Sequence, residues 1–281
     1  MTVVSGTVRD EVLRLEQIPP LSATANELLR VAADPDMDAK RLAAILDKDA
    51  ALTARIIGLA NSAFFGQSRP VLSMEDAIIR VLGQDMVRSL ALSMALAGSF
   101  DISRCPAYDL RNYWVTALGT ATLARDLAAA VGKPEVVHPD GAYLCGLLHS
   151  LGELTLMHLR PDLMCDAVHA HLDDPSLDPI ELERLHLGVD RWQAGEWLAF
   201  RWHLPEQVQH SIGFFGSGSY EGSHQALVQV VAAARAWVMA SLAGDLPDLN
   251  PPDAAAEEFQ RIVTHFHGRL DELKALAAGL V

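Results

Sequence analysis

Apolar residues recur at three- and four-residue steps along nearly the whole chain, and this helical spacing is the feature that most restricts the fold. Ala and Leu together make up roughly three residues in ten, and both favour helices. Strand-like alternation is nearly absent. The chain is therefore predicted to be all-α, with helices over residues 21–33, 38–46, 50–60, 73–83, 85–98, 109–131, 141–148, 152–158, 162–171, 179–187, 191–202, 205–212, 225–243 and 254–281.

Residues with short polar side chains mark the ends of several of these helices. Asp49 precedes the helix 50–60, and Ser73 is followed three residues later by Asp76, as in a capping box. Asn61 follows the apolar helix 50–60. Its side-chain amide is expected to bind backbone groups that the helix end leaves without partners.

A non-helical stretch at 99–107, which contains Cys105 and Pro106, divides the chain into two groups of helices. We predict an N-terminal helical subdomain over 15–105, a second helical subdomain over 106–245 and a C-terminal amphipathic helix over 254–281. The apolar stripe of this last helix either packs back on the domain or forms a homodimer. The stripe comprises Phe259, Ile262, Phe266, Leu270 and Leu273.

The chain is acidic, with 22 Lys and Arg residues against 36 Asp and Glu residues and a formal net charge of −14. Such a charge repels phosphate backbones and anionic lipid, and no window holds three consecutive basic residues. Residues 38–59 superficially resemble a helix-turn-helix, but Asp47 and Asp49 oppose DNA binding there. We therefore expect neither nucleic acid nor a membrane as a partner.

The sequence predicts neither export nor insertion into a membrane. Residues 1–15 lack the apolar core of a signal peptide, and no run approaches the ~20 apolar residues of a spanning helix. Cys105, Cys145 and Cys165 are an odd number without CxxC spacing. They are expected to be free thiols in a reducing cytoplasm, rather than parts of a disulfide framework or a zinc site.

The histidines give little sign of a metal site. His169 and His171 are two residues apart, as are His265 and His267, so the members of each pair face different sides of a helix. His149 differs because it lies in the apolar segment Gly-Leu-Leu-His-Ser-Leu-Gly. It is either a satisfied core histidine or a partner of the Cys145 thiol, although a cysteine in such a segment is more often a small buried apolar side chain.

An ordered set of motifs resembles the HDOD domain, the non-catalytic relative of the HD phosphohydrolases. The set consists of Ile-Pro-Pro-Leu at 18–21, Asp-Lys-Asp-Ala-Ala-Leu-Thr at 47–53, Ala-Asn-Ser-Ala-Phe-Phe-Gly at 60–66, Ala-Ile to Leu-Gly at 77–83, the His149 segment at 146–152 and Trp-His-Leu-Pro at 202–205. The segment 60–66 is expected to be structural through Asn61, Ser62, Phe64 and Gly66.

This resemblance also indicates where an HD enzyme would hold its metal ions. Of the ligand positions only His149 keeps a ligating residue. The others carry Thr116, Ser150, Arg191, Phe214 with Phe215, and Arg235. One histidine is too few for a two-metal site, and two arginines nearby would repel the ions. The resemblance therefore implies the scaffold without the metal chemistry, and we expect no catalytic residue, no metal and no cofactor.

The leading interpretation is a non-enzymatic, stand-alone bacterial signalling protein that binds members of cyclic-di-GMP or two-component pathways, or a small ligand. The alternative is a residual phosphodiesterase acting on a cyclic dinucleotide or a (p)ppGpp-like molecule. One expectation is that Phe214, Phe215 and Tyr220 form a contact surface for a partner. The alternative is that the two phenylalanines fill the pocket that the metal ions occupy in an HD enzyme. Arg191 and Arg235 either clamp a phosphate or carboxylate, or are engaged in ordinary salt bridges.

Overall fold

The structure is a computed structural model that describes residues 19–31, 37–244 and 254–281, with side chains from residue 257 onward in the last range. These residues form helices and loops without a strand, which confirms the all-α class. Residues 15–18, which begin the predicted N-terminal subdomain and include the first residue of the motif at 18–21, lie outside the described residues. The helices are α2 (Ala23–Val31), α3 (Ala39–Leu46), α4 (Ala50–Ala60), η1 (Ala63–Phe65), α5 (Met74–Asp76), η2 (Ala77–Leu82), α6 (Gln84–Ala97), α7 (Leu110–Val131), α8 (Pro139–Leu148), α9 (Leu151–Leu159), α10 (Pro161–Asp173), α11 (Pro179–Leu187), α12 (Arg191–Arg201), α13 (Glu206–Phe214), α14 (Gln225–Ala243), α15 (Ala254–His267) and α16 (Leu270–Ala278).

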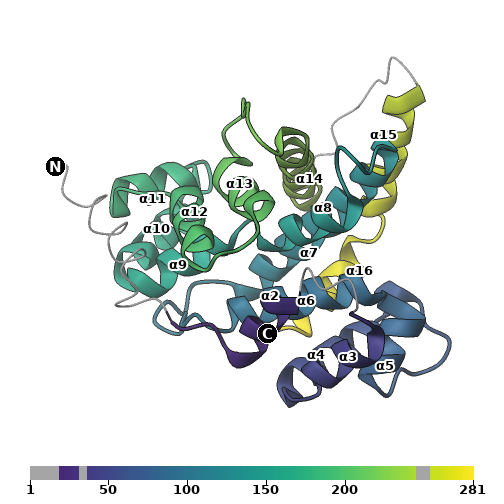
Figure 1. Ribbon diagram of the computed structural model, residues 1–281. Helices are drawn as coiled ribbons and strands as arrows, with labels where there is room; N and C mark the ends of the chain where they lie inside the picture. The colour runs from purple at the N-terminus through teal and green to yellow at the C-terminus, as the bar shows by residue number, and fades with distance from the viewer. Residues whose placement is uncertain (1–18, 32–36, 245–253) are drawn as a thin grey trace.

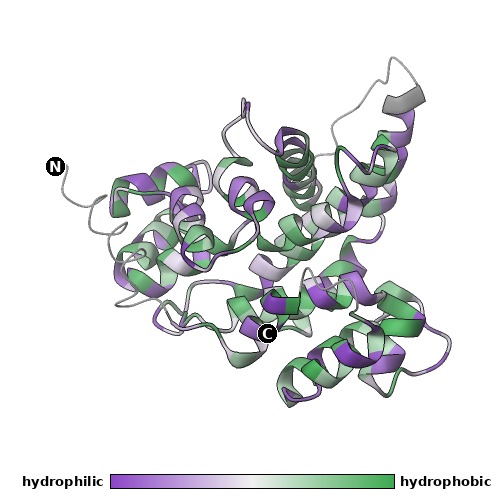
Figure 2. Cartoon of the chain, viewed as in Figure 1, coloured by the Kyte–Doolittle hydropathy of each residue, from purple (hydrophilic) through white to green (hydrophobic). Residues whose placement is uncertain are grey.

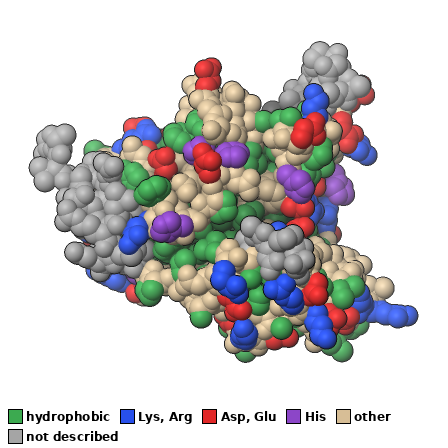
Figure 3. Space-filling view, viewed as in Figure 1, with side chains coloured by type: hydrophobic (Ala, Val, Ile, Leu, Met, Phe, Trp, Pro, Cys, Tyr) green, Lys and Arg blue, Asp and Glu red, His purple; other side chains and the backbone are tan. Residues whose placement is uncertain are grey.

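The N-terminal helices gather on one side of the molecule, and the helices α9–α12 gather on the other (Figure 1). The caps act as the sequence predicts: Asp49 accepts from the amide of Leu52, and Ser73 accepts from the amide of Asp76. The buried residues of the helices are mostly apolar and form the core. Figure 2 shows apolar residues in green and polar residues in purple alternating along the helices. On the face shown in Figure 3, basic and acidic side chains are interspersed over α3–α5.

Asn61 joins the end of α4 to the loop that follows. Its amide donates to the carbonyls of Ile57 and Val71, at 3.1 and 2.8 Å, and its side-chain oxygen accepts from the amide of Val71 at 2.7 Å. The neighbouring turn ends at Gly66, whose φ of 58° is a conformation that glycine adopts without a Cβ clash. Phe64 packs partly buried beneath the guanidinium of Arg269.

Replacing Asn61 by leucine is expected to lower the free energy of unfolding by about 1–3 kcal/mol, because both backbone groups of Val71 lose their partner. Thermal unfolding followed by circular dichroism measures this loss. Gln67→Ala is the control, because Gln67 makes one exposed hydrogen bond to Phe65. Equal melting temperatures for wild type and Asn61→Leu would contradict the structural role.

The long helix α7 lies at the centre and packs against α8, α14 and the C-terminal helices. The larger apolar core runs from α2 through α7 to α16, with α6 packed on α8, and a second, smaller apolar cluster joins α9, α10, α11 and α12. The predicted subdomain boundary near residue 105 stays a prediction. The tail is two helices rather than the single one expected, with the break at residues 268–269. Phe266 and Leu273 pack against Gly119 of α7, so the apolar stripe covers the chain's own core.

Among the described residues, α14 alone is long and apolar enough to cross a membrane. This corrects the expectation that no segment reaches that length and hydropathy. In the structure α14 packs along α7 and against α8 and α13, with Leu227, Val231 and Val238 buried. A core helix in this position meets the same length and composition criteria as a spanning helix.

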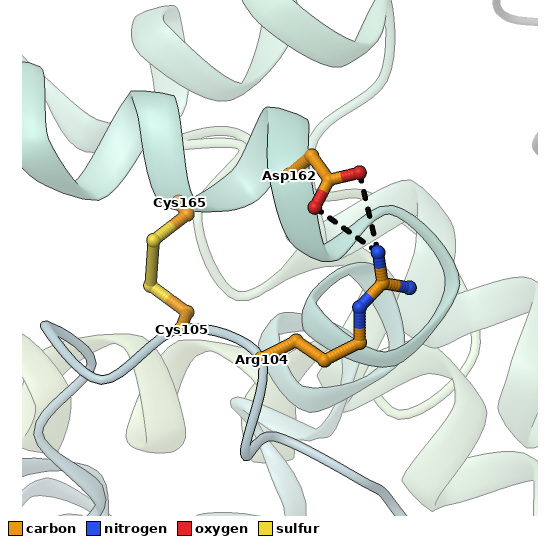
Figure 4. The surroundings of a disulfide bond; sticks show 4 residues. All are labelled: Arg104, Cys105, Asp162 and Cys165. Atoms are coloured by element: carbon orange, nitrogen blue, oxygen red, sulfur yellow. Dashed lines mark hydrogen bonds and ion pairs between the residues drawn. A yellow bond between two sulfur atoms is a disulfide. The ribbon is translucent and has the colours of Figure 1, made fainter.

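Cys105 and Cys165 form a disulfide with a Cα–Cα distance of 5.4 Å, so the expectation of three free thiols is wrong for these two (Figure 4). The bond ties the loop before α7 to α10, and Arg104 forms an ion pair with Asp162 beside it at 3.1 Å. The two cysteines are 60 residues apart. Local spacing rules consider only nearby cysteines, whereas folding brings this distant pair together.

Candidate functional site

A cavity of about 210 Å³ lies between α7, α9, α10, α11, α12 and α14. It is lined by four residues at positions that the sequence analysis assigned to lost metal ligands: Thr116, Ser150, Arg191 and Arg235. These residues span more than a hundred positions of the chain, and the helix crossings bring them together. We call this space the α7–α12 cavity.

Close helix crossings at glycines build one wall of the cavity. A Cβ at Gly152 of α9 would lie 1.8 Å from the backbone oxygen of Arg191 and 2.6 Å from the backbone nitrogen of Gly195 on α12. Both helices can therefore approach only with glycine at position 152. This contact places Glu153, the next residue of α9, beside the side chain of Arg191.

Arg191 is held by two acids at the base of the cavity. Its guanidinium donates to Glu153 at 2.6 Å and to Glu183 of α11 at 2.6 Å, and its backbone amide donates to Glu183 at 2.9 Å. Burial lowers the pKa of Arg191, but Glu153 and Glu183 more than offset this and raise it above the ordinary value. Burial raises the pKa of Glu183, and Arg191 opposes that shift. Arg191 is therefore a salt-bridged structural cation.

His149 is buried beside this cluster at 1% exposure. Its Nδ1 lies 2.7 Å from the carbonyl oxygen of Gly146, which requires the proton on Nδ1, and its Nε2 is buried without a partner among the described residues. Burial, then the charges of Arg235 and Arg191, lower the pKa of His149 to about 3. The imidazole is neutral near pH 7.

Of the two alternatives for Cys145, a partner of His149 or a small buried side chain, the structure supports the second. The thiol of Cys145 donates to the carbonyl of Gln207 at 3.7 Å. Burial raises the pKa of this thiol to about 12, so it stays protonated near neutral pH. Cys145 thus matches the expected small buried side chain, and a buried protonated thiol is a poor nucleophile.

Arg235 of α14 is the second arginine at the cavity. Its Nε is buried without a hydrogen bond, and it forms no ion pair within the described part of the chain. Burial and then the charge of Arg191 lower its pKa to about 10, partly offset by Glu153. It remains charged near pH 7. Of the two arginines, only this one is left to meet an anion.

Phe214 and Phe215 are neighbours in the chain but contact different aromatic rings. Phe215 meets the ring of His149 edge-on at a centroid distance of 5.0 Å and that of Trp192 at 5.7 Å, so it fills the space beside the His149 imidazole. Phe214 points the other way and stacks on Tyr220 at 4.6 Å. Phe214 at the end of α13 and Tyr220 in the loop that follows are half-buried and do not line the cavity.

A family model named HDOD domain matches residues 18–215 of this chain. The chain belongs to the HDOD family. The match covers all the motifs on which the resemblance rests, including Asn61, His149 and the Trp202 segment.

Relatives of this HDOD protein have bacterial sources. It is 28% identical to an uncharacterised protein of Treponema pallidum over 213 residues, which is 76% of this chain but only 40% of that protein. Among solved structures, a provisionally named signal transduction protein from Marinobacter aquaeolei aligns with TM-score 0.79 at 24% identity, covering 100% of this chain and 67% of the other. A provisionally named phosphohydrolase from Shewanella amazonensis aligns with TM-score 0.76 at 24% identity, covering 98% of each chain.

The residues of this HDOD protein do not fit the two metal ions of an HD phosphohydrolase. Four of the assigned ligand positions line the cavity, with the guanidinium groups of Arg191 and Arg235 and the hydroxyl groups of Thr116 and Ser150. His149 is buried and is not part of this lining, although its Nε2 has no hydrogen-bond partner among the described residues. The nearest carboxylates, Glu153 and Glu183, are engaged by Arg191. A cation placed there would be repelled by Arg191 and Arg235, and Asp109, the third acid of the lining, accepts a hydrogen bond from the amide of Arg111 at the start of α7.

Sequence reasoning missed the two acids that hold Arg191. Glu183 is 1% exposed and lies between the buried Leu182 and Leu187, so an acid within an apolar helix face was the available signal. Glu153 follows Gly152, the last residue of the His149 segment, and none of the motifs includes it. Their common partner lies 8 and 38 residues away in the chain, and no local spacing indicates it.

Proposed function

We propose that this HDOD protein is a non-enzymatic regulatory protein of bacterial signal transduction that acts by binding. The observation that carries the proposal is the ion pair of Arg191 with Glu153 and Glu183 at the position of a lost metal ligand. A buried arginine held by two acids fixes a positive charge where a hydrolase needs a metal ion. The packing of Phe215 on His149 fills part of the same space.

The α7–α12 cavity is the proposed binding site, and Arg235 is its recognition residue. A buried guanidinium without an acidic partner favours a carboxylate or phosphate group. We propose that a signalling protein in the cytoplasm supplies this group.

Hydrolysis assays test the non-enzymatic part. Purified protein with Mg²⁺ or Mn²⁺ is expected to release no product from cyclic di-GMP, (p)ppGpp or model phosphodiesters, because the metal ligands are missing. Released product is measured by chromatography. Turnover that is abolished both by a chelator and by His149→Ala would overturn the proposal in favour of a residual phosphodiesterase.

Capture from the native cell tests the binding part. The wild-type protein is expected to retain a signalling partner that Arg235→Ala loses, while the melting temperature stays within about 2 °C, because Arg235 makes no ion pair to lose. Arg261→Ala is the matched control, because Arg261 is an exposed arginine paired with Glu258. If wild type and Arg235→Ala retained the same partner equally well, the α7–α12 cavity would not be its binding site.

A further inference from the structure

Three side chains with metal-binding atoms converge at the start of α13, away from the α7–α12 cavity. Glu206 and His210 lie one turn apart on α13, and His224 stands at the start of α14. Nε2 of His210 and Nε2 of His224 lie 3.9 and 3.8 Å from the two oxygens of Glu206. Figure 3 shows histidine and acidic side chains next to one another over α13.

The ring of His210 is oriented by the loop that follows α13. Its Nδ1 lies 3.2 Å from the carbonyl oxygen of Ser223 and 3.2 Å from the hydroxyl of Tyr220, which itself donates to Ser223 at 3.0 Å. Nδ1 therefore carries the proton, and the lone pair of Nε2 faces Glu206 and His224. A ligating histidine in a metal site is typically held in this way, with its other nitrogen bound to a carbonyl.

His224 is turned toward α13 by its backbone. Its φ of 62° is left-handed, a conformation that residues other than glycine rarely adopt. The stacked rings of Phe214 and Tyr220 brace the connecting loop from the other side. The three ligand atoms consequently lie within 4.8 Å of one another although 14 residues separate His210 from His224.

The charge around the cluster also suits a cation. Glu206 and Glu196 both place negative charge close to His210. These two carboxylates face the imidazoles from α13 and from α12. The nearest guanidinium groups of the cavity belong to another part of the fold and do not line this cluster.

We propose that Glu206, His210 and His224 form a binding site for a divalent transition-metal ion, with Zn²⁺ as its best match. Two imidazoles and one carboxylate are ligands that Zn²⁺ prefers, whereas Mg²⁺ and Ca²⁺ prefer sites made of oxygen atoms. Tetrahedral Zn²⁺ places its nitrogen and oxygen ligands about 3.3 Å apart. Each histidine therefore needs to move about half an ångström closer to Glu206, and the three ligand atoms, which lie within 4.8 Å of one another, need to close by at most about 1.5 Å. A fourth position would remain open to solvent.

Zinc binding by the purified, disulfide-bonded full chain tests this proposal. Equilibrium dialysis with micromolar Zn²⁺ and elemental analysis should give one tightly bound ion per chain. His210→Gln and His224→Asn are each expected to weaken binding at least tenfold, because each removes one of three ligands. Tyr220→Phe should weaken it about tenfold without changing the stoichiometry, because Tyr220 orients a ligand.

Two controls separate this site from others. His149→Ala and His171→Gln should bind Zn²⁺ as the wild type does, because neither residue belongs to the cluster.

The proposal would be overturned if the wild-type protein bound no Zn²⁺, or if His210→Gln and His224→Asn bound Zn²⁺ as tightly as the wild type does. Loss of the ion in His149→Ala alone would place it at the former HD position, which would count against the non-enzymatic function as well. Circular dichroism of each variant without Zn²⁺ verifies folding, and the two ligand variants lie on different elements.

Discussion

Replacing Arg191 by leucine is expected to lower the free energy of unfolding by about 3–5 kcal/mol near pH 7, the range found when one partner of a buried ion pair is removed. Arg191 is buried, and its removal leaves the carboxylates of Glu153 and Glu183 facing each other without a cation. Chemical denaturation followed by circular dichroism measures the loss.

The loss should depend on pH. Burial already raises the pKa of Glu183 in the folded protein, and the pull of Arg191 is what opposes this shift. Without Arg191 the folded-state pKa rises further above the unfolded value. The folded state then binds a proton that the unfolded state releases, so the stability of the variant rises as the pH falls through that interval. Arg191→Leu should therefore be least stable, relative to wild type, above pH 7.

Two further variants separate charge from packing. Arg261→Leu should change stability by less than about 1 kcal/mol, because Arg261 is an exposed arginine. Adding Glu153→Gln and Glu183→Gln to Arg191→Leu should recover part of the loss, because neutral side chains need no cation. A pH-independent loss, or a triple variant no more stable than Arg191→Leu, would show that the charges are not its cause.

Adding a single methyl group at Gly152 is expected to cost about 3–4 kcal/mol, which is large for such a small change. The new Cβ would overlap the backbone of Arg191 and Gly195, and backbone atoms cannot rotate away as a side chain can. Gly152→Ala would force α9 and α12 apart and would pull Glu153 away from Arg191. Thermal unfolding should show a melting temperature lower by several degrees.

Gly58→Ala is the matched control for this change. Gly58 lies inside α4, and a Cβ there meets no atom within 4 Å. Alanine forms helices better than glycine does, so this variant should be more stable by about 0.5–1 kcal/mol. If Gly152→Ala and Gly58→Ala had the same effect on stability, the helices α9 and α12 would not approach as closely as the structure shows.

The sequence by itself determined the helices and the family. Helix formation depends on contacts three and four residues apart and on caps such as Asp49 and Ser73, so the pattern of the chain contains the needed information. The motif around Asn61 was likewise predictable, because it bonds the end of its own helix and a loop ten residues away. Where the local signal is weak, at the break in the tail near residue 268, the prediction of a single helix is wrong.

Only the tertiary structure decided which distant residues meet. The sequence analysis placed Arg191 and Arg235 at one site, but it could not tell that Arg191 is bound by Glu153 and Glu183 while Arg235 forms no ion pair within the described residues. It likewise missed the bond between Cys105 and Cys165. Such contacts join residues from different helices, and their distances are set by how the helices cross, which depends on packing over the whole core rather than on the spacing of any one segment.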